Sequence, residues 1–152
     1  MYSNIFSLIR TAQDRDILLS EIKAVKEVQF EPKTSLESVF TSRLRASVAA
    51  IFRTKAEGGA LDSYMTGLEA ALASLNEVKM TLAREPSEEV VDAISTWLSK
   101  NMGENTIFSV TVNPQALGGA LVSFQGKYYD GSLEHELAQY FLEQKDGLGL
   151  GI

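Results

Sequence analysis

The apolar residues of this chain change their spacing once, near Leu75, and that change constrains the fold more than any other feature of the sequence. Before Leu75 they recur every three or four residues, the period of a helix with one buried face. After it they alternate, with Val78, Met80 and Leu82 on one side, as in a half-buried strand. The spacing therefore predicts an α+β protein, in which an antiparallel helical bundle precedes a small mixed α/β domain.

The helical part is divided by a proline and by a pair of glycines. The first apolar stretch is interrupted by Asp14-Arg15-Asp16, which predicts one broken helix or two, ending at Pro32. A second helix is expected to start at a capping box, Thr34-Ser35-Leu36-Glu37, and to end at Gly58-Gly59. Its predicted buried positions are Leu36, Val39, Phe40, Leu44, Val48, Ile51 and Phe52. A third helix should run from Leu61 to Leu75, and the short connections predict an antiparallel arrangement.

The mixed part contains signals for strands and helices in alternation. After the strand at 78–82, Ser87 is expected to cap a helix whose apolar stripe is Val90, Val91, Ile94, Trp97 and Leu98. A strand at 106–112 follows, and 120–124 should pair with 127–129 as a hairpin across Gln125-Gly126. A last helix is predicted over 132–144. The predicted organisation is a helical bundle at 1–75, an α/β domain at 76–145 and a flexible tail at 146–152.

Charge and composition exclude several classes of function. The formal net charge is −6, the opposite of the basic surface that binding to nucleic acid requires. The chain has no cysteine, which excludes disulfides and sites that use sulfur ligands. No apolar run approaches the ~20 residues that cross a bilayer, so direct membrane insertion is not expected. Residues 1–10 lack a basic start and a cleavage site, which predicts a chain that is cytosolic as synthesised.

The residues that could support chemistry do not form a recognisable catalytic set. His135 is flanked by Glu134 and Glu136, but consecutive helical positions point away from each other and favour a solvated face. Gly118-Gly119 precedes a strand, whereas phosphate loops precede a helix, so the pair is assigned to backbone geometry. Asp130-Gly131-Ser132 is predicted to be a turn and helix cap, and Trp97 a core residue. We expect no catalytic residue, no cofactor and no metal.

The motifs of the second half occur in a characteristic order. They are Val78-Lys79-Met80-Thr81-Leu82, Pro86-Ser87-Glu88-Glu89, Phe108-Ser109-Val110-Thr111-Val112, then the structural positions Pro114, Gly118 and Gly119, and finally Asp130, Gly131 and Ser132. In this order and spacing they resemble the C-terminal part of the delta subunit of F-type ATP synthases, whose mitochondrial counterpart is the oligomycin-sensitivity-conferring protein. The resemblance covers about 77–141.

The resemblance implies a peripheral-stalk connector that catalyses nothing. In that family a six-helix N-terminal domain holds the alpha subunits of the catalytic head, and a C-terminal domain holds the peripheral-stalk b subunits. Together they couple proton or sodium flow to ATP synthesis at the cytoplasmic face of the membrane. Candidate partner-contacting residues here are Ile5, Leu8, Ile9, Leu133, Leu137, Tyr140 and Phe141.

Two features depart from the family pattern. The bundle has room for three or four helices instead of six, and Glu134, His135 and Glu136 follow Ser132 where the family commonly has a basic residue. Two alternatives remain. An E-type stalk subunit of a vacuolar or archaeal-type ATPase would need one long N-terminal helix, which Pro32 and Gly58-Gly59 interrupt. A small ligand-binding or enzymatic domain would use Gly118-Gly119 and His135.

Overall fold

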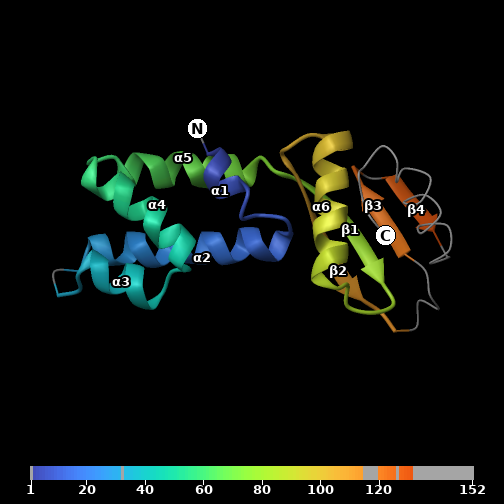
Figure 1. The fold of residues 1–152 in the computed structure, drawn as a ribbon, viewed down its shortest axis with the longest axis horizontal. Coiled ribbons are helices and arrows are strands. Elements are labelled where there is room, and N and C mark those ends of the chain that lie inside the picture. The colour runs from blue at the N-terminus through green and yellow to red at the C-terminus, as the bar shows by residue number, and fades with distance from the viewer. Residues whose placement is uncertain (1, 32, 115–119, 126, 132–152) are drawn as a thin grey trace. The chain divides into compact units, whose positions relative to one another are not determined.

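A computed structural model of the chain describes residues 2–31, 33–114, 120–125 and 127–131. The described chain forms two compact units, whose elements are labelled in Figure 1. The first unit contains the chain up to Ile9 together with Gln13–Ser74. The second contains Arg10–Ala12 together with the chain from Leu75 onward. The sequence did not predict that three residues of the N-terminal region would join the second unit.

The first unit is helical. Its elements are α1 (Ser3–Phe6), α2 (Ala12–Gln29), α3 (Leu36–Ser42), α4 (Ala46–Glu57) and α5 (Leu61–Ala73). The longest of them has 18 residues, so the single long helix of an E-type subunit does not form. Large apolar side chains from these helices are fully buried, among them Ile5, Leu18, Ile22, Phe52, Met65 and Leu68. The predicted third helix is confirmed as α5, and α4 ends before Gly59, whose positive φ of 68° suits glycine.

Two predicted helix boundaries in the first unit are wrong. The N-terminal helix breaks at residues 7–11, and Asp14-Arg15-Asp16 instead lies within the first turns of α2. The cap of α3 is Ser35 and not Thr34: Ser35 is extended, and its Oγ accepts from the amide of Ser38. The hydroxyl of Thr34 donates to Glu31, and Glu37 pairs with Arg53, so the reciprocal capping box does not form.

The predicted second helix is split into α3 and α4 around Arg45. Arg45 has extended torsions (φ −62°, ψ 142°), and its amide donates to Oε1 of Glu21 at 2.7 Å. Glu21 comes from α2, 24 residues earlier, and is only 4% exposed. The apolar spacing runs through the break without a change of phase, which is why periodicity alone predicts one helix.

The second unit is built on a four-stranded sheet. Its elements are β1 (Asn76–Leu82), α6 (Glu88–Met102), β2 (Thr106–Val112), β3 (Ala120–Phe124) and β4 (Lys127–Gly131), with strand order β2-β1-β3-β4. Strands β1 and β2 are parallel, with Val78 opposite Phe108, and α6 makes the crossover between them. Strands β3 and β4 are antiparallel to each other. Strand β3 also pairs antiparallel with β1, through Lys79, Met80 and Thr81 of β1.

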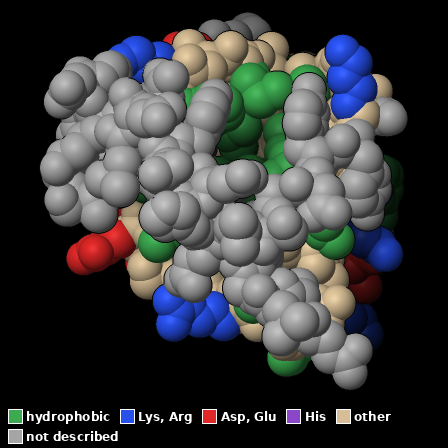
Figure 2. Space-filling model, turned by 90° about the vertical axis from the view of Figure 1, so that its right-hand side faces the viewer, with side chains coloured by type: hydrophobic (Ala, Val, Ile, Leu, Met, Phe, Trp, Pro, Cys, Tyr) green, Lys and Arg blue, Asp and Glu red, His purple; other side chains and the backbone are tan. Residues whose placement is uncertain are grey.

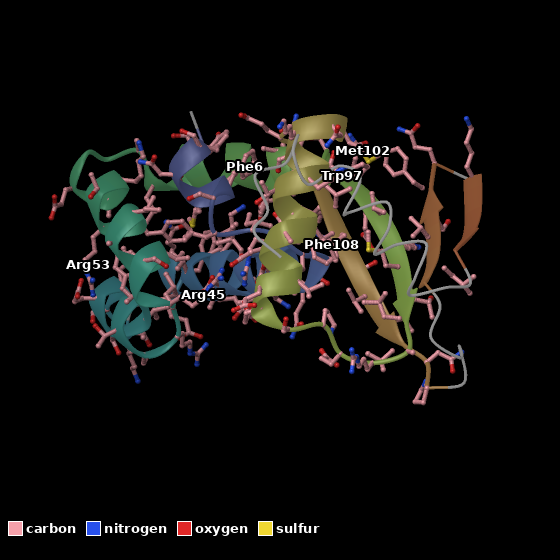
Figure 3. The ribbon with its side chains drawn as sticks, turned by 45° about the vertical axis from the view of Figure 1, so that its right-hand side comes forward. Phe6, Arg45, Arg53, Trp97, Met102 and Phe108 are labelled. Atoms are coloured by element: carbon pink, nitrogen blue, oxygen red, sulfur yellow. The ribbon has the colours of Figure 1, made fainter. Side chains whose placement is uncertain are left out.

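The core of the second unit lies between α6 and the sheet. Val78, Met80 and Phe108 of the strands are buried with Val91, Ile94 and Leu98 of α6. Trp97 and Met102 are partly buried against the same cluster, on the side of α6 that faces the strands in Figure 3, which confirms the core assignment of Trp97. Val90 is 45% exposed although it shares the helix face of Ile94 and Trp97, four and seven residues later; it lies in the first turn of α6.

The predicted hairpin is confirmed, with one correction. Gln125 lies in the turn with a positive φ of 49°, and Phe124 pairs with Lys127. Strand β4 continues through Asp130 and Gly131, which pair with Leu121 and Ala120, so these two residues are strand and not turn. Ser132, the predicted helix at 132–144 and the tail at 146–152 lie outside the described residues.

Candidate interaction surfaces

The family-motif positions follow β2 and end β4. Pro114 is exposed in the turn after β2, and the backbones of Asp130 and Gly131 complete the ladder with β3. Gly118, Gly119 and Ser132 lie outside the described residues. Where the structure describes them, the motif residues therefore have backbone roles at the margin of the second unit's sheet.

The predicted partner-contacting residues of the first unit are mostly internal. Ile5 is 0% exposed and Ile9 is 8% exposed, while Leu8 is half-buried. Leu133, Leu137, Tyr140 and Phe141 lie outside the described residues. The most exposed large hydrophobic side chain that the structure describes is Phe30, at 86%, just after α2. It was not singled out from the sequence, because an apolar residue at a helix end can be either buried or exposed.

Arg10 joins a cluster with two acidic residues of α6. Its Nη1 lies 2.6 Å from Oδ1 of Asp92 and 3.0 Å from Oε2 of Glu88. The hydrogen bond to Asp92 raises the pKa of Arg10 above its ordinary value, partial burial opposes this, and the bond to Glu88 adds to it. All three side chains retain solvent exposure, at 32%, 65% and 81% for Arg10, Asp92 and Glu88. No local pattern connects residues so far apart in sequence.

Glu21 and Arg45 form the most buried ion pair of the described residues. Besides accepting from the Arg45 amide, Glu21 accepts from its guanidinium, with Nη2 at 2.9 Å from Oε2 and Nε at 3.2 Å from both oxygens. The Arg45 side chain is 34% exposed and the Glu21 side chain 4%. Because one carboxylate holds both the charge and the backbone of Arg45, it fixes the start of α4. Figure 3 labels Arg45 and also Arg53, which belongs to a second pair.

The second pair joins α3 to α4 at the surface. Nη2 of Arg53 lies 2.6 Å from Oε1 of Glu37, and the guanidinium carbon lies 5.9 Å from the centroid of the Phe40 ring. The hydrogen bond from Arg53 lowers the pKa of Glu37, and the same bond raises the pKa of Arg53. The pair therefore ties α3 to α4.

The described residues of the first unit form a small groove. It lies between the end of α2 and α3, with a volume of about 180 Å³, and its lining includes Glu27, Val28, Glu31, Ser38, Val39 and Arg43. That volume is below the ~300 Å³ at which most small-molecule sites begin. Among the residues that the structure describes, no group of three or more His, Asp or Glu side chains could hold a metal ion. His135 lies outside the described residues, so this finding does not concern it.

The surface of the second unit is mixed in character. On the face shown in Figure 2, hydrophobic side chains are visible in the upper middle, and Lys and Arg side chains lie toward the margins. Val90 and Val112 are the exposed large hydrophobics that the structure describes in this unit, at 45% and 39%. None of the described helices is both long and apolar enough to cross a bilayer.

Comparison with known proteins identifies the chain's relatives. The model of the family described as "ATP synthase delta (OSCP) subunit" matches residues 59–141, more than half of the 152 residues. A protein named ATP synthase subunit delta, from Carboxydothermus hydrogenoformans, is 35% identical over 60 residues. That alignment covers 40% of this chain and 34% of the relative, so the matched segment spans about a third of the relative's length.

Proposed function

This chain belongs to the family of ATP synthase delta (OSCP) subunits, and from that premise we propose that it is a non-catalytic connector in the peripheral stalk of a rotary F-type ATP synthase. It links the catalytic head to the stalk b subunits and prevents the head from turning with the rotor. Ion flow through the membrane part then drives ATP synthesis. The subunit acts as a peripheral member of the complex at the cytoplasmic face of the energy-transducing membrane.

The observation that carries this proposal is the family match over residues 59–141 of a chain built as two compact units. A connector has to hold two partners at once, and two separately stabilised folds can each offer a surface to one partner. The first unit has its own helical core, and the second has a sheet and α6. The matched region begins at Gly59, two residues before α5, and includes every described strand of the second unit.

We assign one partner to each unit. The first unit binds the N-terminal segments of the alpha subunits, with Leu8 as the accessible member of the set Ile5, Leu8 and Ile9. The second unit binds the C-terminal helix of a b subunit through Leu133, Leu137, Tyr140 and Phe141. A helix laid on an apolar surface is held by a few buried anchors more than by charges at the rim.

Beside Leu8, we propose that Phe30, the most exposed large hydrophobic side chain that the structure describes, also contacts the head. Because its ring is 86% exposed, Phe30→Ser should leave the core intact. If the ring is buried against the head, the loss of about 1.5–3 kcal/mol of apolar burial weakens head binding at least tenfold. Ile17→Ser, at a residue 39% exposed in the same unit, is the matched control. Unchanged affinity of the Phe30 variant, measured with purified head, would remove Phe30 from the contact.

The stalk end can be tested with a substitution at Leu137. Leu137→Glu in the full chain should abolish binding to a b-subunit fragment, whereas Val90→Glu, an exposed apolar position of α6, should not. The urea midpoint of each variant shows whether the fold is retained. Loss of binding that follows only from loss of fold would contradict the assignment of Leu137 as an anchor.

The function as a whole can be tested by reconstitution. Membrane vesicles stripped of their own delta subunit should recover ATP-driven proton pumping when the full chain is added. The isolated chain should not hydrolyse ATP. If the full chain binds neither head nor stalk and restores no pumping, the proposed function is wrong.

A further inference from the structure

Residues Arg10–Ala12 are held on the second unit although their neighbours on both sides belong to the first. Thr11 forms a parallel bridge with Phe108, and the Phe108 amide donates to the carbonyl oxygen of Arg10 at 3.4 Å. This places the short segment beside β2, along the edge that β1 does not occupy. The Arg10 side chain then reaches α6, at Glu88 and Asp92. The backbone of the segment thus contacts β2, and the side chain of Arg10 contacts α6.

We propose that Arg10–Ala12 is a latch: a reversible attachment of the N-terminal region to the second unit that limits the motion of the two units relative to each other. While the latch is closed, the polypeptide is fixed to the second unit both before Gln13 and after Ser74, the two ends of the larger segment of the first unit. When it opens, only the junction between Ser74 and Leu75 remains. This inference concerns the chain's own conformation and does not depend on the proposed function.

The chemistry of the latch makes it weaker than either folded unit. The ion pairs of Arg10 with Glu88 and Asp92 involve side chains that are 81% and 65% exposed, and exposed pairs contribute little to stability and are screened by salt. The strand pairing that the structure describes for this segment is an isolated bridge, not a ladder. By contrast, each unit is held by a buried apolar core. Opening therefore costs far less than unfolding, and it should respond to ionic strength.

Hydrogen exchange of the Phe108 amide in the full chain tests the latch. Arg10→Ala should speed this exchange about tenfold, the change expected from losing two exposed ion pairs. Raising the salt concentration should speed it in the unchanged protein and have little further effect in the variant. Arg53→Ala, which removes an ion pair confined to the first unit, is the matched control and should leave Phe108 unchanged. Equal exchange in all three proteins would overturn the latch.

A charge reversal separates the ion pair from a general effect on folding. Arg10→Asp should open the latch, and Asp92→Arg in the same chain should close it again by restoring an opposite pair. Backbone relaxation of 15N amides reports the second part of the proposal: the correlation times of the two units should diverge in Arg10→Asp and reconverge in the double variant. Correlation times that do not change when Phe108 exchange has accelerated would show that the segment does not restrain the units.

Discussion

At Gly67, in α5, the absence of a side chain makes room for the hydroxyl of Tyr2, which would collide with a Cβ atom there. Alanine is favoured over glycine within a helix by about 1 kcal/mol. Moving Tyr2 would weaken its ring contact with Tyr64, at 5.2 Å between centroids, which is worth about 0.5–1.5 kcal/mol. The two effects oppose each other, so Gly67→Ala should leave the urea midpoint nearly unchanged.

The same substitution should behave differently once Tyr2 is shortened. In a Tyr2→Ala background nothing opposes the helical gain, and Gly67→Ala should stabilise the chain by about 1 kcal/mol. Urea unfolding of the four proteins in this cycle measures the coupling. An identical effect of Gly67→Ala in both backgrounds would contradict the close approach of Tyr2.

The Glu37–Arg53 pair predicts a pH dependence of stability. Hydrogen bonding to Arg53 lowers the pKa of Glu37 in the folded state relative to the unfolded chain. The contribution of the pair is therefore complete above the unfolded pKa and is lost as the pH falls through the lower, folded one. The difference in urea midpoint between the protein and Glu37→Gln should be largest near neutral pH and disappear in acid. A difference that stays constant with pH would indicate an uncharged cause.

At the scale of elements, Glu21 decides where α4 begins. Glu21→Ala leaves the Arg45 amide and guanidinium without their acceptor and should destabilise the chain by about 2 kcal/mol, less than a fully buried pair because Arg45 is partly exposed. Glu21→Gln keeps an oxygen that can accept from the amide and should cost less. Thermal or urea unfolding measures both. If glutamine and alanine are equally damaging, the charge and not the cap fixes the break.

The elements also show what local sequence can and cannot predict. Ser87 caps α6 as expected, because the cap and the amide of Val90 that it accepts from lie within one turn. The break before α4 could not be predicted, since its cause is a carboxylate on another helix. The parallel pairing of β1 with β2 is implied by a helix between two strands, whereas the place of β3 on the other side of β1 depends on long-range contacts.

The candidate contacts show the same limit. Ile5 and Ile9 fit an apolar face equally well whether that face meets a partner or the chain's own core, and in the structure both side chains are buried. Phe30, with no periodic neighbours, gave no signal. Nothing in Arg10-Thr11-Ala12 indicates that it lies beside a strand, because the alternation of apolar residues that marks strands is too short to detect there.

At the scale of the whole molecule, the second unit is discontinuous in sequence. A fragment of residues 76–144 is expected to fold alone because α6 covers its sheet, but it lacks the segment beside β2. Adding residues 8–14 to that fragment through a flexible linker should raise its stability by about 1 kcal/mol. Urea midpoints of the two fragments measure this. The same extension carrying Arg10→Ala is the control and should give little gain.

The separation of Arg10 from Asp92 also sets an order of events during synthesis. The two residues are 82 positions apart. At about 5–20 residues per second, a ribosome adds Asp92 roughly 4–16 seconds after Arg10. The helices α2 to α5 are made in that interval and can fold before the partner of Arg10 exists. A segment translated before α2 therefore reaches its final neighbours only after α6 has been made, later than the helices that follow it directly in the sequence.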